Sequence, residues 1–284
     1  MSVVFTVDND RVSIEGASPA ELDALDKACA FQHRDGGHMA GKSFYNRADA
    51  QQVWDGWVRF LERPKTIPPW LPSGLRFKAA EVLVAQGCVV KVNDIRTFPE
   101  PLPEFVERYP DPIPLREHQK ACAEAMCEHL DVVAEMPPRA GKTRTLFEVV
   151  RRRGVPTIWT APTTSIVDQT IAAAREFFHD YDVMAVGSSN QNDSLVRNAL
   201  LTVCTASGML KLTEDFWQTR QLLVADEVHH YLGQRGWGKQ IRRMAKHISQ
   251  RKGMSGTFFR SAGDDIALHA FLSNVGYKIL SSDL

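Results

Sequence analysis

Two short stretches of this sequence carry residue types that could bind and hydrolyse a nucleoside triphosphate. In the first, EMPPRAGKTRT (residues 135–145), a predicted strand gives way to a predicted helix at Gly141-Lys142-Thr143. The N–H groups of such a loop bind phosphates, the lysine reaches the terminal phosphates, and the threonine hydroxyl binds Mg²⁺. Met136 replaces the first glycine of the G-x-x-x-x-G-K-T pattern. The strand before and the helix after still favour a phosphate loop over an ordinary helix start with a surface lysine.

The second stretch, LLVADEVHH (residues 222–230), brings two adjacent carboxylates to the end of an apolar predicted strand. There one of the two carboxylates, Asp226 and Glu227, can hold Mg²⁺ through water while the next orients and deprotonates the attacking water. His229 and His230 follow, but adjacent side chains diverge and no third ligand is evident, which argues against a zinc site. The two stretches together predict a nucleoside triphosphate and Mg²⁺ as ligands.

Length and composition indicate a globular protein of one large domain or two ordinary ones. The 284 residues are 44% hydrophobic and 24% charged, enough for a sizeable buried core. No run approaches the roughly 18–20 apolar residues that span a bilayer, and MSVVFTVDND lacks the features of a signal peptide. The five cysteines form no C-x-x-C pair, which favours buried free thiols in a reducing compartment. We therefore expect a cytoplasmic protein without a membrane partner.

Charge is balanced over the whole chain but not along it. Residues 1–112 carry 13 Lys/Arg against 16 Asp/Glu, and residues 113–284 carry 21 against 18. The run RGWGKQIRRMAKHISQRK (residues 235–252) has seven Lys/Arg and no acid. Such a run is usually a solvated helix face, but beside a phosphate-handling site a contact with a polyanion becomes more plausible.

A proline-rich segment divides the chain. Six prolines lie between Phe98 and Pro114, and proline fixes φ and removes a backbone donor, so the segment is predicted to be an extended connector. We place a small α+β domain at residues 1–97, a linker at 98–113 and a larger α/β domain at 114–284.

The first domain shows short strand and helix signals. Two strands flank an Asp-Asn-Asp turn, and a helix follows Ser18 with Pro19 at its first position. The segment 48–62 is predicted to be a helix, and its apolar face is read as core in preference to a base-stacking platform. That face would consist of Val53, Trp54, Trp57, Val58 and Leu61. A helix at 74–87 and a strand at 88–94 complete this part.

The larger domain alternates apolar strands with helices. Helices are expected at 115–130, 142–153 and 164–178, and strands at 132–136, 156–162, 182–186, 200–206, 221–227 and 253–258. Short apolar strands between helices predict a parallel sheet covered by helices on both faces. Ligands of such sheets bind beyond the carboxyl ends of the strands, where both chemical stretches fall.

Motif for motif, this part resembles the first RecA-like motor domain of superfamily 2 helicases, the DEAD/DEAH-type ATP-dependent translocases. The resemblance rests on LREHQ, PPRAGKT, TAPTTSIVDQ, TVCTAS, DEVHH and MSGTFFR, in that order over about residues 115–260. Many members replace the first glycine of the phosphate loop. The resemblance implies ATP contacts from Arg116, Gln119, Pro138, Arg139, Ala140, Gly141, Lys142, Thr143 and Arg144. It also implies Mg²⁺ ligation by Thr143 and Asp226, catalysis by Lys142, Asp226 and Glu227, and coupling through His229, Ser255 and Thr257.

The resemblance further implies contacts with a nucleic-acid strand. Hydroxyl groups and free N–H groups at a helix start suit sugar-phosphate contacts that do not read sequence, although helix capping would explain the same residues. The expected contacts are Pro162, Thr163, Thr164, Thr205 and Ser207. DNA is the expected partner, with RNA as the alternative.

The first domain resembles, more faintly, the accessory domain of phage UvsW-like branched-DNA helicases, through WDGWVRFLE, PSGLRF and GCVVKVND. This implies a domain that recognises duplexes or junctions, in a bacterial or phage-infected cytosol. Motors of this superfamily use two RecA-like domains, and no second series of strands and helices follows residue 260. We therefore expect half of a motor, completed by the missing part of a longer chain or by a separate subunit. It would bind ATP–Mg²⁺ and nucleic acid but hydrolyse poorly alone. The alternatives are a non-catalytic nucleic-acid-binding module and the motor subunit of a restriction translocase.

Overall fold

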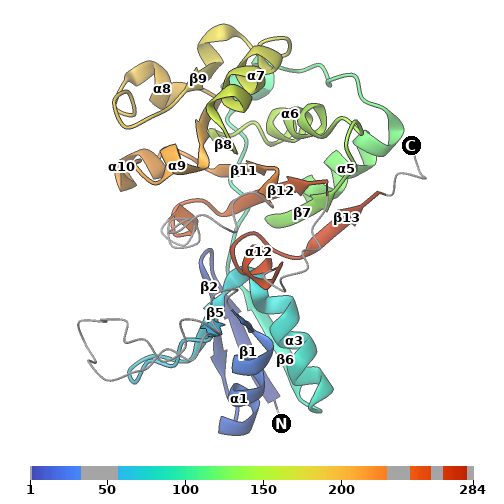
Figure 1. Ribbon diagram of the computed structural model, residues 1–284, viewed down its shortest axis with the longest axis vertical. Coiled ribbons are helices and arrows are strands. Elements are labelled where there is room, and N and C mark those ends of the chain that lie inside the picture. Colours follow the sequence, from blue (N-terminus) through green and yellow to red (C-terminus); the bar gives the residue numbers. More distant parts are fainter. Residues whose placement is uncertain (1, 33–56, 229–243, 257–264, 280–284) are drawn as a thin grey trace. The chain divides into compact units, whose positions relative to one another are not determined.

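The computed structural model describes residues 2–32, 57–228, 244–256 and 265–279. The chain separates into two compact units (Figure 1). Unit 1 comprises Met1–Ile95 with Phe259–Ala270, and unit 2 comprises Arg96–Phe258 with Phe271–Leu284. Each unit is described by itself.

Unit 1 is built on a four-stranded sheet in the order β5-β2-β1-β6. Its strands are β1 (Ser2–Val7), β2 (Arg11–Glu15), β5 (Trp70–Pro72) and β6 (Val89–Asp94). The turn between β1 and β2 is fixed by Asp8, whose carboxylate accepts the N–H groups of Asp10 and Arg11 at 3.0 and 2.9 Å. β6 runs parallel to β1 at the sheet edge. The predicted pair of strands around an Asp-Asn-Asp turn is confirmed.

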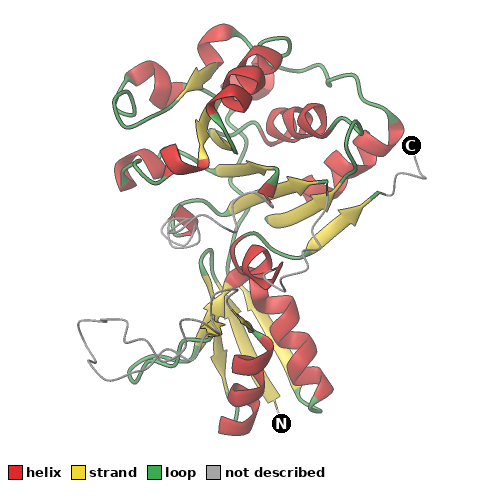
Figure 2. Ribbon diagram, in the orientation of Figure 1, coloured by secondary structure: helices red, strands yellow, loops and turns green. Residues whose placement is uncertain are grey.

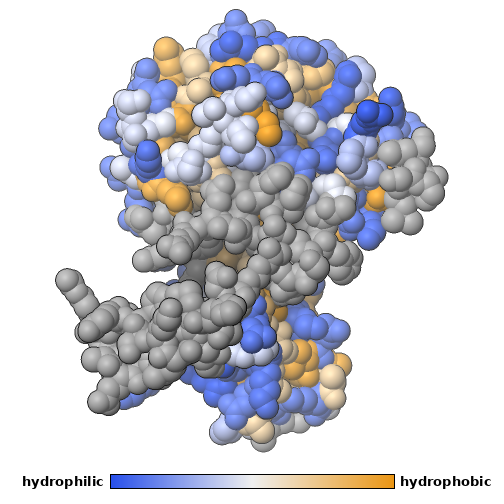
Figure 3. All heavy atoms as spheres, in the orientation of Figure 1, coloured by the Kyte–Doolittle hydropathy of each residue, from blue (hydrophilic) through white to orange (hydrophobic). Residues whose placement is uncertain are grey.

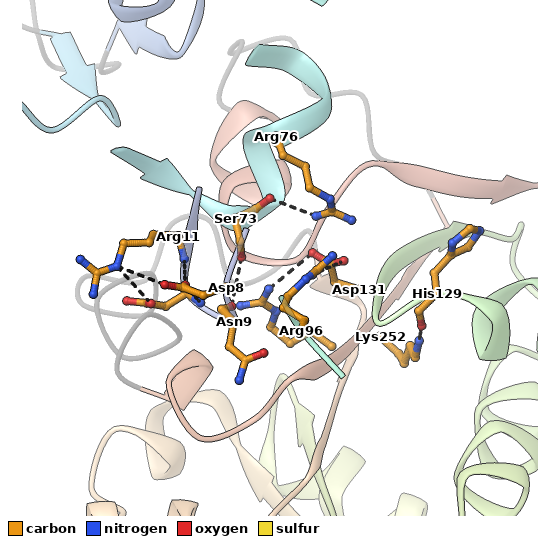
Figure 4. A network of polar contacts seen from close by, with 11 residues as sticks. Asp8, Asn9, Arg11, Ser73, Arg76, Arg96, His129, Asp131 and Lys252 are labelled. Atoms are coloured by element: carbon orange, nitrogen blue, oxygen red, sulfur yellow. Dashed lines mark hydrogen bonds and ion pairs between the residues drawn. The ribbon is translucent and has the colours of Figure 1, made fainter. Parts of the chain in front are cut away.

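The described helices of unit 1 include two that begin within two residues of the predicted positions and one, at 265–271, that the sequence did not predict. They are α1 (Pro19–Ala28), the short 3₁₀ helix η1 (Ser73–Leu75), α3 (Arg76–Ala85) and most of α12 (Asp265–Phe271). α1 starts with a reciprocal cap, in which Ser18 Oγ accepts the Glu21 N–H and the Glu21 carboxylate accepts the Ser18 N–H. Ser73 at the start of η1 donates its hydroxyl to the Asn9 carbonyl and accepts Arg76 at its own carbonyl (Figure 4). These contacts tie η1 and α3 to the turn of the β1–β2 hairpin.

One predicted helix of unit 1 is wrong over its described part. Trp57–Arg59 is a strand, β4, paired antiparallel with β3 (Ala30–Gln32). Trp57 is 41% exposed, so it is not a core residue, whereas Leu61 is buried. Aromatic and β-branched residues suit a strand as well as a helix, and the pairing partner lies far upstream, where local periodicity cannot detect it. Val53 and Trp54 lie outside the described residues.

Unit 2 contains a seven-stranded sheet that is parallel throughout, in the order β13-β7-β12-β11-β8-β10-β9. The strands are β7 (Asp131–Glu135), β8 (Thr157–Ala161), β9 (Val183–Ala185), β10 (Leu201–Thr205), β11 (Leu222–Asp226), β12 (Gln250–Ser255) and β13 (Val275–Lys278). Because the strands are parallel, their carboxyl ends all lie at one edge of the sheet. The predicted parallel sheet is confirmed; β13 was not predicted.

Helices flank this sheet (Figure 2). They are α4 (Pro103–Arg108), α5 (Glu117–Glu128), α6 (Lys142–Arg153), α7 (Thr164–Ala174), α8 (Ser194–Asn198), α9 (Ala206–Met209) and α10 (Glu214–Trp217), with the 3₁₀ turn η2 (Asp180–Asp182). α6 buries Leu146, Phe147, Val149 and Val150, and the Phe147 ring lies 5.2 Å from that of Trp159 on β8. Each such buried side chain contributes about 1.5–3 kcal/mol, so packing holds α6 rigidly on the sheet.

The proline-rich segment is part of unit 2, includes the helix α4, and contacts the second half of α6. Its backbone is held through four contacts: Ile113 N–H to Glu148, Arg151 to Tyr109 O, Leu102 N–H to Gly154 O, and Arg153 to Pro99 O, at 2.9–3.3 Å. Glu148 is fully buried, and burial works to raise the pKa of its carboxyl. Hydrogen bonds from Arg151, Arg152 and Ile113 outweigh burial and lower that pKa. Glu148 therefore stays ionised as an anchor for the segment.

Buried charges gather at the amino-terminal ends of β7 and β12 (Figure 4). Asp131 accepts Arg96 at 2.9 Å and Arg251 at 3.4 Å, and all three side chains are at most 4% exposed. Lys252, also fully buried, donates to the His129 carbonyl. Burial lowers the pKa of Lys252 to about 7. The last two cations of the basic run 235–252 are thus strand residues of the interior, not part of a solvated helix face or a polyanion contact.

On the face shown in Figure 3, the described surface of unit 2 is mainly hydrophilic, with scattered hydrophobic side chains. Within the described residues, no helix has both the length and the apolar character that crossing a bilayer requires. All five cysteines are free thiols, and Cys127 alone among them is not buried.

Candidate functional site

The two chemical stretches meet at the carboxyl edge of the sheet in unit 2. β7 leads into the phosphate loop, β11 ends at Asp226, and β12 lies between these two strands. The Lys142 ammonium lies 2.7 Å from the Glu227 carboxylate. Residues that are far apart in sequence therefore converge on one place.

The first position of the phosphate loop is a packed residue. Met136 is fully buried within the core of unit 2. Its N–H donates to the Ser255 carbonyl at the end of β12, at 3.0 Å. A position whose side chain enters the core and whose N–H is used by the sheet does not require glycine, so Met136 is compatible with a phosphate loop.

The end of the loop has a left-handed backbone. Arg139 has φ of 68° and Gly141 has φ of 86°. The left-handed backbone at position 141 favours glycine, and a Cβ there would collide with the Gln119 amide nitrogen and displace that side chain. Gly141 is also the N-cap of α6, and its carbonyl accepts the Thr145 N–H and hydroxyl.

The Ala140 carbonyl accepts two side chains from the first turn of α5. Gln119 Nε2 donates at 2.8 Å and His118 Nε2 at 3.1 Å. The Gln119 oxygen in turn accepts the Arg116 N–H at 2.9 Å. Gln119 therefore holds the phosphate loop, a role that the sequence did not predict. His118 was not singled out from the sequence, because the only signal was its position beside Gln119.

A cavity of about 420 Å³ opens beside this contact. Its lining consists of Pro114, Leu115, Arg116, Gln119, Arg139, Gly141 and Arg144. Arg139 and Arg144 are exposed, and the Arg144 guanidinium lies 5.0 Å from the centre of the Phe177 ring. Five of the residues expected to contact ATP thus surround one cavity next to the phosphate loop. Of the others, Pro138 and Ala140 lie in the loop itself, and Lys142 and Thr143 begin α6.

Glu227 and Lys142 form a partly shielded ion pair. Their side chains are 26% and 13% exposed. Glu227 has φ of 49°, a left-handed conformation that is uncommon for a non-glycine residue. A Cβ at Gly256 would lie 3.5 Å from Lys142 Nζ, so the chain that follows Ser255 passes beside the lysine.

Asp226 is a buried carboxylate with an unsatisfied oxygen. It is 5% exposed, and its Oδ1 has no hydrogen-bond partner among the described residues. Burial, and next the charge of Glu227, raise the pKa of Asp226 to about 6, although Lys142 acts in the opposite direction. A bare carboxylate oxygen beside a second carboxylate is the donor type that Mg²⁺ prefers. The half-buried Thr143 opens α6 at the same edge, so the residues present fit this ion.

The expected coupling residues are only partly described. Ser255 is fully buried at the end of β12, and its carbonyl accepts the Met136 N–H. It thus joins the end of β12 to the phosphate loop. His229 and Thr257 lie outside the described residues.

The expected nucleic-acid contacts lie on the next two strands of the sheet. β8 and β10 are neighbours, with Thr205 in register with Ala161, so Pro162 and Thr163 follow at the same level. Thr163 and Thr205 both cap helices, accepting the Ile166 and Gly208 N–H groups. Thr164 and Ser207, which lie close to these two capping residues in the sequence, are exposed. The Ser207 hydroxyl lies 3.2 Å from that of Thr205. These hydroxyls, called the hydroxyl row below, lie at the same edge of the sheet as the phosphate loop, with β12 and β11 between β7 and β8. Capping accounts for only two of them.

Two solved structures are similar to the whole chain, both of the UvsW helicase from bacteriophage T4. The first aligns with a TM-score of 0.74 at 17% identity, covering 98% of this chain and 100% of that chain. The second aligns with a TM-score of 0.73 at 17% identity, covering 98% of this chain and 57% of that chain. This chain therefore spans little more than half of the second protein. At this identity the likeness establishes the fold.

A search of curated proteins by sequence returned no match. A family model does match: the DEAD/DEAH box helicase model covers residues 116–265, more than half of the chain. That range begins at Arg116 and includes the phosphate loop, the acidic pair and the hydroxyl row described above. The chain belongs to the DEAD/DEAH box helicase family, and its unit 2 is a superfamily 2 RecA-like motor domain.

Proposed function

We propose that this chain is the ATP-binding half of an ATP-dependent DNA helicase or translocase that acts on duplex or branched DNA. The observation that carries the proposal is the convergence at the carboxyl edge of the sheet. Lys142 pairs with Glu227 at 2.7 Å, and beside them Asp226 retains a buried carboxylate oxygen with no described partner. A merely structural site would not leave that oxygen bare, because burying an unpaired charge is costly.

The residues of the phosphate loop would bind the phosphates. The backbone N–H groups of Gly141 and of the start of α6 would supply donors and a favourable dipole. Lys142, which is held by Glu227, would turn to the terminal phosphates, and Glu227 would then be free to orient and deprotonate a water molecule. Thr143 and Asp226 would hold Mg²⁺, which neutralises phosphate charge when bound.

The base would occupy the cavity beside α5. Gln119 uses one N–H and one lone pair for the loop and for Arg116. A primary amide has two N–H donors and two acceptor lone pairs, so one of each remains. These match the N7 acceptor and the N6 donor of adenine, as in other Gln–adenine pairs. Arg116 and Arg144 line the same cavity and would cover the base and sugar.

The row of hydroxyls on the neighbouring strand ends would contact one nucleic-acid strand. Thr164 and Ser207 are exposed beside the two capping threonines. Hydroxyl and N–H donors bind sugar-phosphate groups without reading bases. Ser255, with His229 and Thr257, would couple this surface to the nucleotide. Unit 1 would recognise the duplex or junction, with DNA as the proposed partner and RNA as the alternative.

Efficient turnover would need a second RecA-like domain, either in the same parent chain or in a separate subunit. In related phosphoryl-transfer enzymes an added arginine is worth about 10³–10⁵ in rate. The 284-residue chain is therefore proposed to bind ATP–Mg²⁺ and DNA while hydrolysing ATP slowly.

The decisive experiment is a titration with the fluorescent nucleotide mant-ATP in Mg²⁺, comparing the wild type with Lys142→Ala. Loss of one charge-assisted contact weakens binding by about 10- to 150-fold. Lys120→Ala is the matched control, because Lys120 is an exposed lysine paired with Glu117 on α5. Equal affinity of the wild type and Lys142→Ala would overturn the nucleotide site.

ATPase assays with fork, duplex and single-stranded DNA and with RNA, at one stated salt concentration, test the rest of the proposal. Slow turnover is expected with every nucleic acid. Rapid DNA-stimulated turnover that Lys142→Ala abolishes would refute the half-motor assignment while leaving the ATP site intact.

A further inference from the structure

Two side-chain donors hold the Ala140 carbonyl of the phosphate loop, an arrangement called the clamp below. One of the two donors belongs to a residue to which no motif assigns a role. Two neighbouring side chains at the start of α5 reach the same oxygen: Gln119 at 2.8 Å and His118 at 3.1 Å. A carbonyl oxygen only accepts hydrogen bonds, so the His118 Nε2 atom must carry a proton here. Gln119 already belongs to the proposed base site, whereas His118 does not line that cavity.

The clamp determines the direction of one peptide group. In a planar trans peptide the C=O and the next N–H point in opposite directions. Two donors on the Ala140 oxygen therefore direct the Gly141 N–H away from α5. Gly141 needs such support, because glycine with φ of 86° has the greatest backbone freedom of any residue.

The first turn of α5 is itself anchored. The Tyr277 hydroxyl on β13 donates to the His118 carbonyl at 3.1 Å. The Arg116 N–H is bound by the Gln119 side chain at 2.9 Å. His118 is partly buried between these contacts. The residue is thus held from its backbone and presents its ring to the loop as a fixed donor.

We infer that His118 is a positioning residue for phosphate binding: its Nε2–H holds the Ala140 carbonyl so that the Gly141 N–H is preset for the phosphates. The inference rests on the proposed ATP site and adds a residue of the LREHQ stretch to which the resemblance assigns no role. Gln119 would thus serve both the base and the loop, while His118 serves the loop alone.

The test compares two amide substitutions of similar polarity. In His118→Gln the side-chain amide nitrogen extends about as far from the backbone as the histidine Nε2, so it can still donate to the Ala140 carbonyl. The side chain of His118→Asn is shorter and does not reach that carbonyl. Mant-ATP affinity should fall roughly two- to twelvefold in His118→Asn, the range for one lost hydrogen bond, and stay within about twofold of the wild type in His118→Gln. His118→Met should match His118→Asn. Lys120→Met, on the same helix, should bind like the wild type.

A second readout separates the phosphate site from the base site. Inorganic tripolyphosphate, which has no base, competes with mant-ATP in each variant. Its affinity should fall in His118→Asn by the same factor as that of mant-ATP. Thermal melting of each variant shows whether it is folded, and the Gln/Asn comparison remains informative if His118→Met does not fold.

Three outcomes would overturn the inference: equal mant-ATP affinity of His118→Gln and His118→Asn, equal affinity of His118→Asn and the wild type, or a loss for mant-ATP without a loss for tripolyphosphate. Failure of the proposed function looks different. In that case the wild type and Lys142→Ala would bind mant-ATP alike, whatever residue stands at position 118.

Discussion

Replacing Asp226 by Asn should stabilise the ligand-free protein while removing its response to Mg²⁺. Asp226 is 5% exposed, and its pKa is raised from 3.8 to about 6, first by burial and then by Glu227. At 1.36 kcal/mol per pKa step, holding the ionised carboxylate in the folded state costs about 3 kcal/mol. The asparagine side chain fills the same space without charge.

The pH dependence of this effect follows from linkage. Between pH 3.8 and about 6 the folded state binds more protons at Asp226 than the unfolded state does, so the free energy of unfolding falls as pH rises. Above about pH 6 the full cost is present. The stability gain of Asp226→Asn should therefore grow by about 2 kcal/mol between pH 4.5 and pH 8, and reach about 2–3 kcal/mol at pH 8.

Thermal melting in EDTA at the two pH values measures this gain. At pH 8 the expected rise in Tm is roughly 4–12 °C. Glu227→Gln provides a second check. Removal of the neighbouring negative charge should lower the pKa of Asp226, so the fall in the free energy of unfolding that accompanies its ionisation should occur at lower pH. In mant-ATP titrations, Mg²⁺ should no longer strengthen binding to Asp226→Asn. A variant less stable than the wild type at pH 8, or a gain equal at both pH values, would refute the reasoning.

Two other buried groups give predictions that melting and thiol chemistry can check. Lys252 has a pKa lowered to about 7 by burial; the unfolded state binds more protons above that value, so wild-type stability should rise with pH. The stability advantage of Lys252→Met should then shrink by about 2 kcal/mol from pH 7 to pH 9, and a pH-independent difference in Tm would contradict this. Burial also raises the pKa of Cys29, Cys122 and Cys204 to about 12. At pH 8 those thiols should not react with DTNB until guanidinium unfolds the chain. Fast labelling of any of them in the folded protein would contradict this and show that the surrounding structure opens to solvent.

The sheet of unit 2 can be predicted from local sequence, because the apolar runs and helix ends that indicate its elements each span only a few residues. The helix predicted at 142–153 has those bounds in the structure, with left-handed glycines at both ends. Most expected strands agree with the structure within one or two residues, since apolar runs between helices leave few alternatives. The proximity of Lys142 and Glu227 can also be predicted from the sequence, because parallel strands place their carboxyl ends at one edge of the sheet.

Contacts between distant segments could not be predicted in this way. β4 pairs with a strand far upstream, and β13 pairs with β7, which lies far upstream in the sequence. Arg251 and Lys252 look like surface cations, but they are buried beside Asp131 and His129. His118 shows no pattern of its own. Its contact exists only because the first turn of α5 lies against the phosphate loop.

The contacts of the proline-rich segment with α6 define how unit 2 could be excised as an independent protein. A version beginning at residue 114 would lose the partners of Glu148, Arg151 and the Gly154 carbonyl. It would leave a fully buried carboxylate short of a donor on the helix that Lys142 begins. A version beginning at Arg96 keeps these contacts and the Arg96–Asp131 ion pair. The shortest self-sufficient motor fragment therefore starts well ahead of its first recognisable motif.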